Sequence, residues 1–202
     1  MILVVCAVAA ELRGFAHARA DVVPVGVGPV EAAIGTTRAL GTKRYELTIN
    51  AGIAGAFAGA AAVGDAVAVT TEHYVEIGRE DGAARALPGG AALAATCAAD
   101  RATLDRLRTR SPALRFGAGV TSATITTSDA RAELLAARYA AATESMEGFA
   151  VLRAAALGGI AAIELRGVSN VVGDRATSQW DFRAGAAAAV RALELFFAQG
   201  AC

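Results

Sequence analysis

Histidine and cysteine are scarce in this sequence, and neither is clustered. The two histidines, His17 and His73, lie far apart, and the three cysteines are scattered. There is no HExxH pattern and no Cys pair at the spacing of a zinc site. An odd number of scattered cysteines, with Cys6 in an apolar run and Cys202 at the end, forms no disulfide framework. We expect reduced thiols, no bound metal and a cytoplasmic location.

An excess of charge of one sign is also missing. The 19 Lys and Arg residues balance 19 Asp and Glu residues, and no segment gathers the basic ones, so the electrostatic footprint of a nucleic-acid binder is absent. Apolar runs stop before the roughly 18 residues that a membrane span needs. The first residues lack the basic segment of a secretory signal. We therefore expect no nucleic-acid or membrane partner and a small-molecule ligand instead.

Short β-rich runs alternate with Ala-rich stretches of helical spacing, which is typical of an α/β domain with a buried sheet. A chain of 202 residues suits one domain. A Gly-rich, charged stretch over residues 78–90 indicates a long loop. The predicted strands are 1–8, 22–27, 47–51, 65–75, 119–126 and 161–168, and the predicted helices are 10–19, 29–40, 100–109, 129–139, 147–157 and 178–199.

Glu11 follows the first predicted strand. Open α/β sheets place ligand-binding groups at the carboxyl ends of their strands, so Glu11 is a candidate catalytic group. A solvated carboxylate in the first turn of the next helix is the structural alternative, because the helix dipole favours it there.

The run NAGIAGAF, residues 50–57, follows the third predicted strand. Its glycines allow backbone N–H groups to approach a ligand closely. The lysine of a P-loop and a GxGxxG that opens a helix are both absent, so neither ATP nor NAD is indicated and we expect no cofactor. A tight turn without a ligand fits the run equally well.

Two later segments carry polar groups into apolar surroundings. In ESMEG, residues 144–148, Glu147 opens an apolar helix, where a cis-diol would supply two donors to its oxygens. A helix-terminal carboxylate beside a core Met is the alternative. In RGVSN, residues 166–170, the amide of Asn170 can donate and accept, as a nucleobase edge requires, or it can cap a turn.

Taken in order, Glu11, NAGIAG with the later Gly64-Asp65, ESMEG and RGVSN resemble the purine nucleoside phosphorylase and nucleosidase superfamily over almost the whole chain. Within it, the sequence is similar to methylthioadenosine/S-adenosylhomocysteine nucleosidases and, more closely, to futalosine hydrolases. The resemblance implies a single nucleosidase domain over residues 1–202, built as a three-layer α/β/α sandwich with a central mixed sheet. It also implies a homodimer or larger homo-oligomer.

The resemblance further implies roles for individual residues. Glu11 would activate the attacking water, Glu147 would hold the ribose hydroxyls, and Thr124 with Ile125 would form the wall against the purine. Asn170 would bind the departing base and so share in catalysis with Glu11. The substrate-binding set that the resemblance implies is Gly52, Ile53, Thr124, Ile125, Met146, Glu147 and Asn170.

Asn170 differs from the adenine-specific nucleosidases of this superfamily, which carry Asp at the matching position. An amide NH₂ donates, which suits purine N7 together with a 6-oxo oxygen. We therefore expect futalosine, a 6-oxopurine nucleoside of menaquinone biosynthesis, as substrate and hypoxanthine with dehypoxanthine futalosine as products. The segment from Asn170 through Arg175 to Trp180 also resembles futalosine hydrolases. Ile53 and Ser145 differ from the methylthioadenosine nucleosidases, so their site geometry does not transfer in full.

Three alternatives stay open. A 6-oxopurine nucleoside phosphorylase would need a phosphate cradle, but the early GDPxR-type segment is absent and Glu11 would repel a phosphate dianion. A nucleosidase acting on methylthioadenosine or aminodeoxyfutalosine would prefer a 6-amino base. A nucleoside-binding protein would bind without releasing base.

Overall fold

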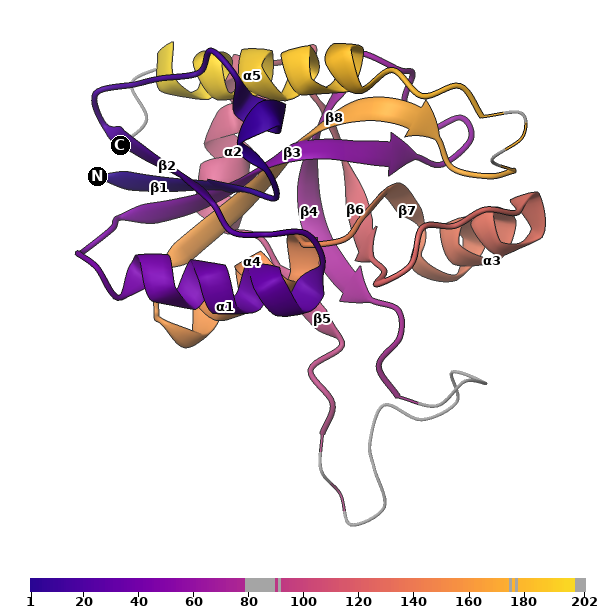
Figure 1. The fold of residues 1–202 in the computed structure, drawn as a ribbon, viewed down its shortest axis with the longest axis horizontal. Helices are drawn as coiled ribbons and strands as arrows, with labels where there is room; N and C mark the ends of the chain where they lie inside the picture. The colour runs from indigo at the N-terminus through magenta and orange to yellow at the C-terminus, as the bar shows by residue number, and fades with distance from the viewer. Residues whose placement is uncertain (79–89, 91, 175, 177, 199–202) are drawn as a thin grey trace.

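The computed structural model describes residues 1–78, 90, 92–174, 176 and 178–198 (Figure 1). Within these residues the strands are β1 (Ile2–Cys6), β2 (Ala20–Pro24), β3 (Leu47–Ala56), β4 (Ala66–Tyr74), β5 (Thr96–Ala98), β6 (Arg115–Thr121), β7 (Ala141–Ser145) and β8 (Ala161–Val171). The helices are a single 3₁₀ turn, η1 (Ala9–Leu12), and α1 (Pro29–Leu40), α2 (Arg101–Arg110), α3 (Asp129–Tyr139), α4 (Gly148–Leu157) and α5 (Phe182–Ala198).

The described strands form one mixed sheet that closes on itself at its centre. The main order is β2-β1-β3-β7-β6-β4-β5, and β8 pairs with both β3 and β4. β8 runs parallel to β3 and antiparallel to β4, so β3, β8, β4, β6 and β7 form a ring. β1, β3 and β8 run parallel to one another, which brings their carboxyl ends to the same edge.

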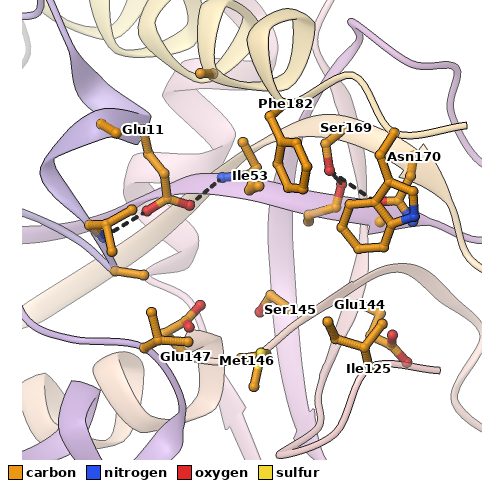
Figure 2. A pocket seen from close by; sticks show the side chains of 18 of the residues that line it. Glu11, Ile53, Ile125, Glu144, Ser145, Met146, Glu147, Ser169, Asn170 and Phe182 are labelled. Carbon is orange, nitrogen blue, oxygen red and sulfur yellow. Dashed lines mark hydrogen bonds between the residues drawn. The ribbon is translucent and has the colours of Figure 1, made fainter.

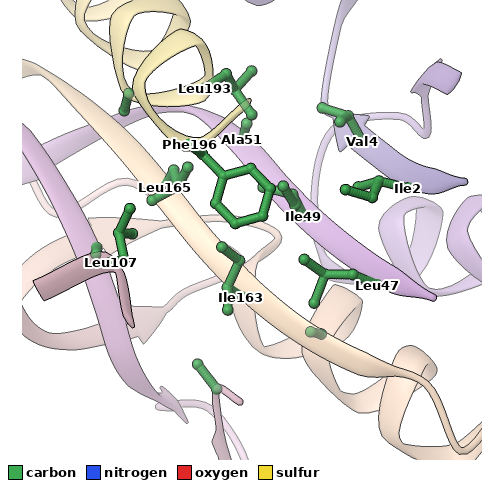
Figure 3. Packing of buried hydrophobic residues seen from close by; sticks show 14 of the residues in the cluster. Ile2, Val4, Leu47, Ile49, Ala51, Leu107, Ile163, Leu165, Leu193 and Phe196 are labelled. Atoms are coloured by element: carbon green, nitrogen blue, oxygen red, sulfur yellow. The ribbon is translucent and has the colours of Figure 1, made fainter. Parts of the chain in front are cut away.

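Helices cover the sheet from both sides, as the three-layer prediction requires. α5 lies along one side and α1 with α4 along the other (Figure 1). On the α5 side, Leu193 and Phe196 pack against Ile49 of β3 and against Ile163 and Leu165 of β8 (Figure 3). Full burial of such a side chain contributes about 1.5–3 kcal/mol relative to exposure. This packing fixes the two strands that carry much of the site.

The predicted helix over 10–19 is wrong. Only η1 forms, because Arg13 leaves the helical region and Gly14 adopts a φ of 89°. The chain then returns to Ala20, which pairs in register with Ile2. The sequence pattern did not indicate that the chain turns back after η1 to form β2.

Other elements were shifted or missed. The strand predicted over 119–126 is β6, which ends at Thr121 and leaves Thr124 and Ile125 in the following loop. β5 and β7 were not predicted, and the predicted helix 178–199 begins at Phe182. In contrast, the bounds of α1 and α3 agree with the prediction, and Ser128 caps α3 by accepting from the N–H of Arg131.

Parts of several sequence predictions lie outside the described residues. These are residues 79–89 of the predicted loop, Arg175, Cys202 and the end of the last predicted helix at residue 199. Across the described part of the chain, the helices are all too short or too polar to cross a bilayer.

Candidate active site

A pocket of about 460 Å³ opens where β1, β3 and β8 end. Figure 2 shows Glu11 at one end of it, Asn170 at the other, and Glu147 with Met146 along the opposite wall. The sequence-predicted residues that line this pocket are Glu11, Ile53, Thr124, Ile125, Met146, Glu147 and Asn170. The fold thus brings five separate sequence segments to one cavity.

Glu11 is held from both sides of its carboxylate. Its Oε1 accepts from the backbone N–H of Ile53 at 3.0 Å, and its Oε2 accepts from the backbone N–H of Val8 at 3.1 Å. The side chain folds back over the one-turn η1, and the residue is only 8% exposed. Glu11 is therefore fixed in place, with lone pairs left to take a proton in the pocket.

Gly52 differs from the other predicted substrate-binding residues. It lies on β3 directly beneath the carboxylate of Glu11, not on the pocket wall. Its role in the structure is to leave room for Glu11, which is an indirect contribution to the site.

Glu147 stands at the N-cap of α4 and faces two donors. Its Oε1 accepts from the backbone N–H of Gly28 at 3.0 Å, and its Oε2 lies 3.5 Å from Nη2 of Arg166. The residue is 5% exposed and lines the pocket beside Met146. These partners fix the carboxyl group in place, and its remaining lone pairs can accept from hydroxyl groups in the pocket.

The amide of Asn170 has a defined orientation. Its Nδ2 donates to the carbonyl of Val171 at 3.2 Å, and that carbonyl can only accept. Its Oδ1 accepts from the hydroxyl of Ser169 at 2.9 Å. One N–H of the NH₂ group thus remains for a ligand in the pocket.

The loop after β6 is tied to β7 through Glu144. Glu144 accepts from both the backbone N–H and the hydroxyl of Thr126. Burial raises the pKa of Glu144, while the two hydrogen bonds from Thr126 oppose that shift. This tie holds Thr124 and Ile125 against the pocket.

An apolar end completes the pocket. Trp180 and Phe182 line it with their rings 5.2 Å apart at 38°. Phe182 is 56% exposed, so this end of the pocket is open to solvent. In the described residues, no cluster of three or more His, Cys, Asp or Glu side chains is arranged to hold a metal.

Comparison with known proteins shows the family of this chain. The family model described as "Phosphorylase superfamily" matches residues 7–198. The futalosine hydrolase of Streptomyces coelicolor is 36% identical over 79% of this chain and 71% of its own. That of Thermus thermophilus is 30% identical over 86% of this chain and 79% of its own. The chain belongs to the phosphorylase superfamily, among the futalosine hydrolases.

A solved structure supports the fold of this superfamily member. The 5′-methylthioadenosine/S-adenosylhomocysteine nucleosidase of Colwellia psychrerythraea, in complex with adenine, superposes with a TM-score of 0.80. The match covers 98% of this chain and 94% of that one at 18% identity, so it bears on the fold alone.

Sequence reasoning missed the residues that support this phosphorylase-superfamily site from beneath. Arg166 was quoted within RGVSN without a role, yet its guanidinium contacts Glu147 and the carbonyl of Ile53. Glu164, two residues earlier on the same strand, accepts from Nε of Arg166 at 2.7 Å. Residues two apart on a strand share a face. A Glu and an Arg two residues apart in an otherwise apolar strand could therefore have predicted the buried ion pair.

Proposed function

We propose that this protein hydrolyses the N-glycosidic bond of futalosine and releases hypoxanthine and dehypoxanthine futalosine, a step in menaquinone biosynthesis. The observation that carries the proposal is that Glu11 and Asn170 face one pocket from opposite ends, with Glu147 across the pocket from Glu11 (Figure 2). A nucleoside has the matching order of groups: a reacting C1′ beside a diol, and a base beyond it. The futalosine hydrolases among its relatives support the choice of substrate.

The reaction needs a base near the anomeric carbon. Glu11 takes a proton from a water molecule, the water oxygen bonds to C1′, and the bond from C1′ to N9 breaks with its electrons passing to the purine. The purine anion takes a proton from water and leaves as neutral hypoxanthine, and Glu11 returns its proton to solvent. The transition state resembles an oxocarbenium ion, as in glycoside hydrolysis. The oxygens of Glu147, and those of Glu11 until it has taken the proton, favour that positive charge electrostatically.

The departing base requires a hydrogen-bond donor. One N–H of the Asn170 side-chain amide donates to the carbonyl of Val171. The other N–H can donate to N7 or to the 6-oxo oxygen of hypoxanthine. If this one N–H is shared between N7 and the 6-oxo oxygen, an amino group at C6 would instead place one donor against another. This preference supports futalosine over aminodeoxyfutalosine and methylthioadenosine.

The nucleophile is water and not phosphate. A phosphate dianion in front of C1′ would lie beside the carboxylate of Glu11, and like charges repel strongly in a partly buried site.

One assay tests the function. Purified protein is incubated with futalosine, aminodeoxyfutalosine, inosine and methylthioadenosine, each with and without phosphate, and the products are identified by mass spectrometry. We expect hypoxanthine from futalosine at the same rate with and without phosphate. Formation of a sugar 1-phosphate would identify a phosphorylase, release of adenine at the higher rate would identify an adenosine-type nucleosidase, and binding without base release would identify a binding protein.

The same proposal includes the organisation of the active protein. We treat residues 1–202 as one nucleosidase domain that acts in the cytoplasm as a homodimer or larger homo-oligomer. Apolar side chains exposed on or beside α1, namely Val27, Val30 and Ile34, support self-association. Light scattering coupled to size exclusion tests the assembly, and cell fractionation tests the location.

A further inference from the structure

Three ionisable side chains lie buried beneath the candidate site. Glu72 of β4 and Glu164 of β8 are 0% exposed, and Arg166 of β8 is 1% exposed. β4 and β8 are antiparallel neighbours, with Val69 opposite Glu164. Burying charges is costly unless each is paired and hydrogen-bonded, so the arrangement of these groups needs a physical explanation.

Arg166 connects this buried cluster to both carboxylates of the site. Its Nη2 lies 3.5 Å from Oε2 of Glu147 and donates to the hydroxyl of Ser145 at 3.2 Å. Its Nη1 donates to the carbonyl of Ile53 at 3.2 Å, and the N–H of Ile53 donates to Glu11. A shift of the Arg166 guanidinium would therefore displace both Glu11, the proposed base, and Glu147, the proposed ribose-binding group.

Glu164 holds the opposite edge of the guanidinium, because its Oε1 accepts from Nε of Arg166. The carboxyl groups of Glu164 and Glu72 lie close together, because Oε1 of each would lie 2.6 Å from a Cβ atom on Gly148. Oε2 of Glu164 and Oε1 of Glu72 are buried and meet no donor among the described residues. Two ionised carboxylates contain no hydrogen to share, so a hydrogen bond between them requires one proton.

The neighbours decide which carboxyl holds that proton. The hydroxyl of Thr121 accepts from the backbone N–H of Phe149 and donates its own hydrogen to Oε2 of Glu72. This leaves Oε1 of Glu72 as the place for the proton. Glu164 faces a permanent cation, which favours its anion. Consistently, burial and the charge of Glu164 raise the pKa of Glu72 well above its ordinary value.

We propose that Glu72 and Glu164 are positioning residues for the reaction: the anion of Glu164 fixes the guanidinium of Arg166 beneath the site, and the neutral acid of Glu72 fixes Glu164. This inference rests on the proposed nucleosidase function. Without the charge of Glu164, Arg166 would be drawn toward Glu147, its remaining anionic contact, and would withdraw that carboxylate from the diol. The buried pair thus keeps Glu147 and Glu11 as the anions that face the substrate.

The two glutamates should respond differently to the same substitution. In E72Q the amide oxygen accepts from Thr121 and the NH₂ group donates to Glu164, as the neutral acid does. E164Q removes the charge that holds Arg166. E72L matches the side-chain size but removes the donor. E194Q, on the exposed surface of α5, is the matched control.

The test is kcat and KM for futalosine with these four variants and the parent, together with their melting temperatures. We expect E164Q and E72L to lose about 10²-fold in kcat, as small misplacements of reacting groups do. E72Q should lose no more than a few-fold, and E194Q should match the parent. The proposal is overturned if E72Q loses as much as E72L, or if folded E164Q keeps the parent kcat.

An infrared measurement tests the shared proton without relying on activity or on a variant that folds poorly. Protein labelled with ¹³C at the Glu carboxyls should show a protonated-acid carbonyl band at neutral pH that E72Q lacks and E194Q retains. Burial also raises the pKa of Glu144 and of Glu164, and any band that comes from Glu144 should persist in E72Q. Absence of any band that depends on Glu72 overturns the pairing, whereas a parent inactive on futalosine contradicts only the proposed function.

Discussion

Gly52 leaves the space that the carboxylate of Glu11 occupies. A Cβ atom on Gly52 would lie 2.7 Å from Oε1 of Glu11 and 3.1 Å from Nη1 of Arg166. The first distance is shorter than real Cβ atoms show, so the carboxylate would have to move.

This relationship predicts the effect of G52A. We expect kcat on futalosine to fall about 10²-fold, because Glu11 is displaced from the attacking water. G158A is the matched control, since Gly158 has an ordinary helical φ of −78° and a Cβ atom there would lie 3.4 Å or more from its neighbours, which are two backbone oxygens and Cδ1 of Leu40. Equal rates for G52A and G158A would show that Glu11 tolerates the displacement or does not act as the base.

The second prediction concerns the base itself. E11Q should lower kcat about 10²–10⁴-fold, because an amide cannot take the proton from water. Both oxygens of Glu11 accept backbone N–H groups, so the Gln NH₂ must face one of them. We therefore expect a lower melting temperature as well, while the Kd for the nucleoside stays within a few-fold. E133Q on the exposed face of α3 is the control, and activity of E11Q near that of E133Q excludes Glu11 as the base.

How far the sequence predicted this molecule depends on the kind of signal. α1 and α3 were found at their bounds because each has a local start signal, Pro29 at the first turn and Ser128 at the N-cap. η1 was extended to a full helix because the segment after Leu12 also contains helix formers, and the return to β2 is set by pairing with β1. Local pattern cannot show a partner strand that comes from elsewhere in the chain.

The residues of the site also differ in whether the sequence alone predicts them. Glu11, Glu147 and Asn170 each follow or open an element, and a resemblance of ordered motifs was enough to group them. The roles of Gly52 and Arg166 depend on distances between β3, β8 and η1, which appear only after the sheet closes. β7 was missed because its sequence, AATES, has little β-branched content, and its pairing with β3 and β6 compensates for that.

The third prediction concerns the ribose. E147Q should raise KM for a ribonucleoside more than for its 2′-deoxy analogue, because only the ribo form donates two adjacent hydroxyls to this carboxylate. The Gln NH₂ would also oppose either the N–H of Gly28 or the guanidinium of Arg166. Paired measurements on inosine and 2′-deoxyinosine separate the two effects. Equal losses on both nucleosides would mean that Glu147 acts only through its protein contacts.

The fourth prediction concerns Cys6, which is 0% exposed at the end of β1. Burial and the nearby charge of Glu11 raise the pKa of its thiol to about 12. At pH 8 only about one thiol in 10⁴ would be ionised, and the thiolate is the reactive form. Iodoacetamide followed by peptide mass spectrometry should therefore label Cys97, which is partly exposed, well before Cys6. Labelling of both at one rate in native protein would contradict the packing around β1.

The last prediction tests whether Asn170 reads the base. In N170D the carbonyl of Val171 would face a carboxyl oxygen where it now accepts from Nδ2 at 3.2 Å. Two acceptors repel, so the substituted Asp should hold a proton there. That acid has one hydrogen to divide between Val171 and purine N7, whereas the amide has two. We therefore expect a lower kcat/KM on every nucleoside.

The ratio between nucleosides should nevertheless change. An Asp oxygen can accept from a 6-amino group, so the preference should shift from futalosine toward aminodeoxyfutalosine. An unpaired buried polar group costs about 1–3 kcal/mol, which corresponds to about one to two decades in relative kcat/KM. The shift should fade as pH rises and the acid ionises, because the donor to N7 is then lost. S169A is the control, since it removes the hydroxyl that donates to Asn170 at 2.9 Å but leaves the amide in place. If N170D keeps the parent ratio at every pH, Asn170 does not select the 6-oxopurine.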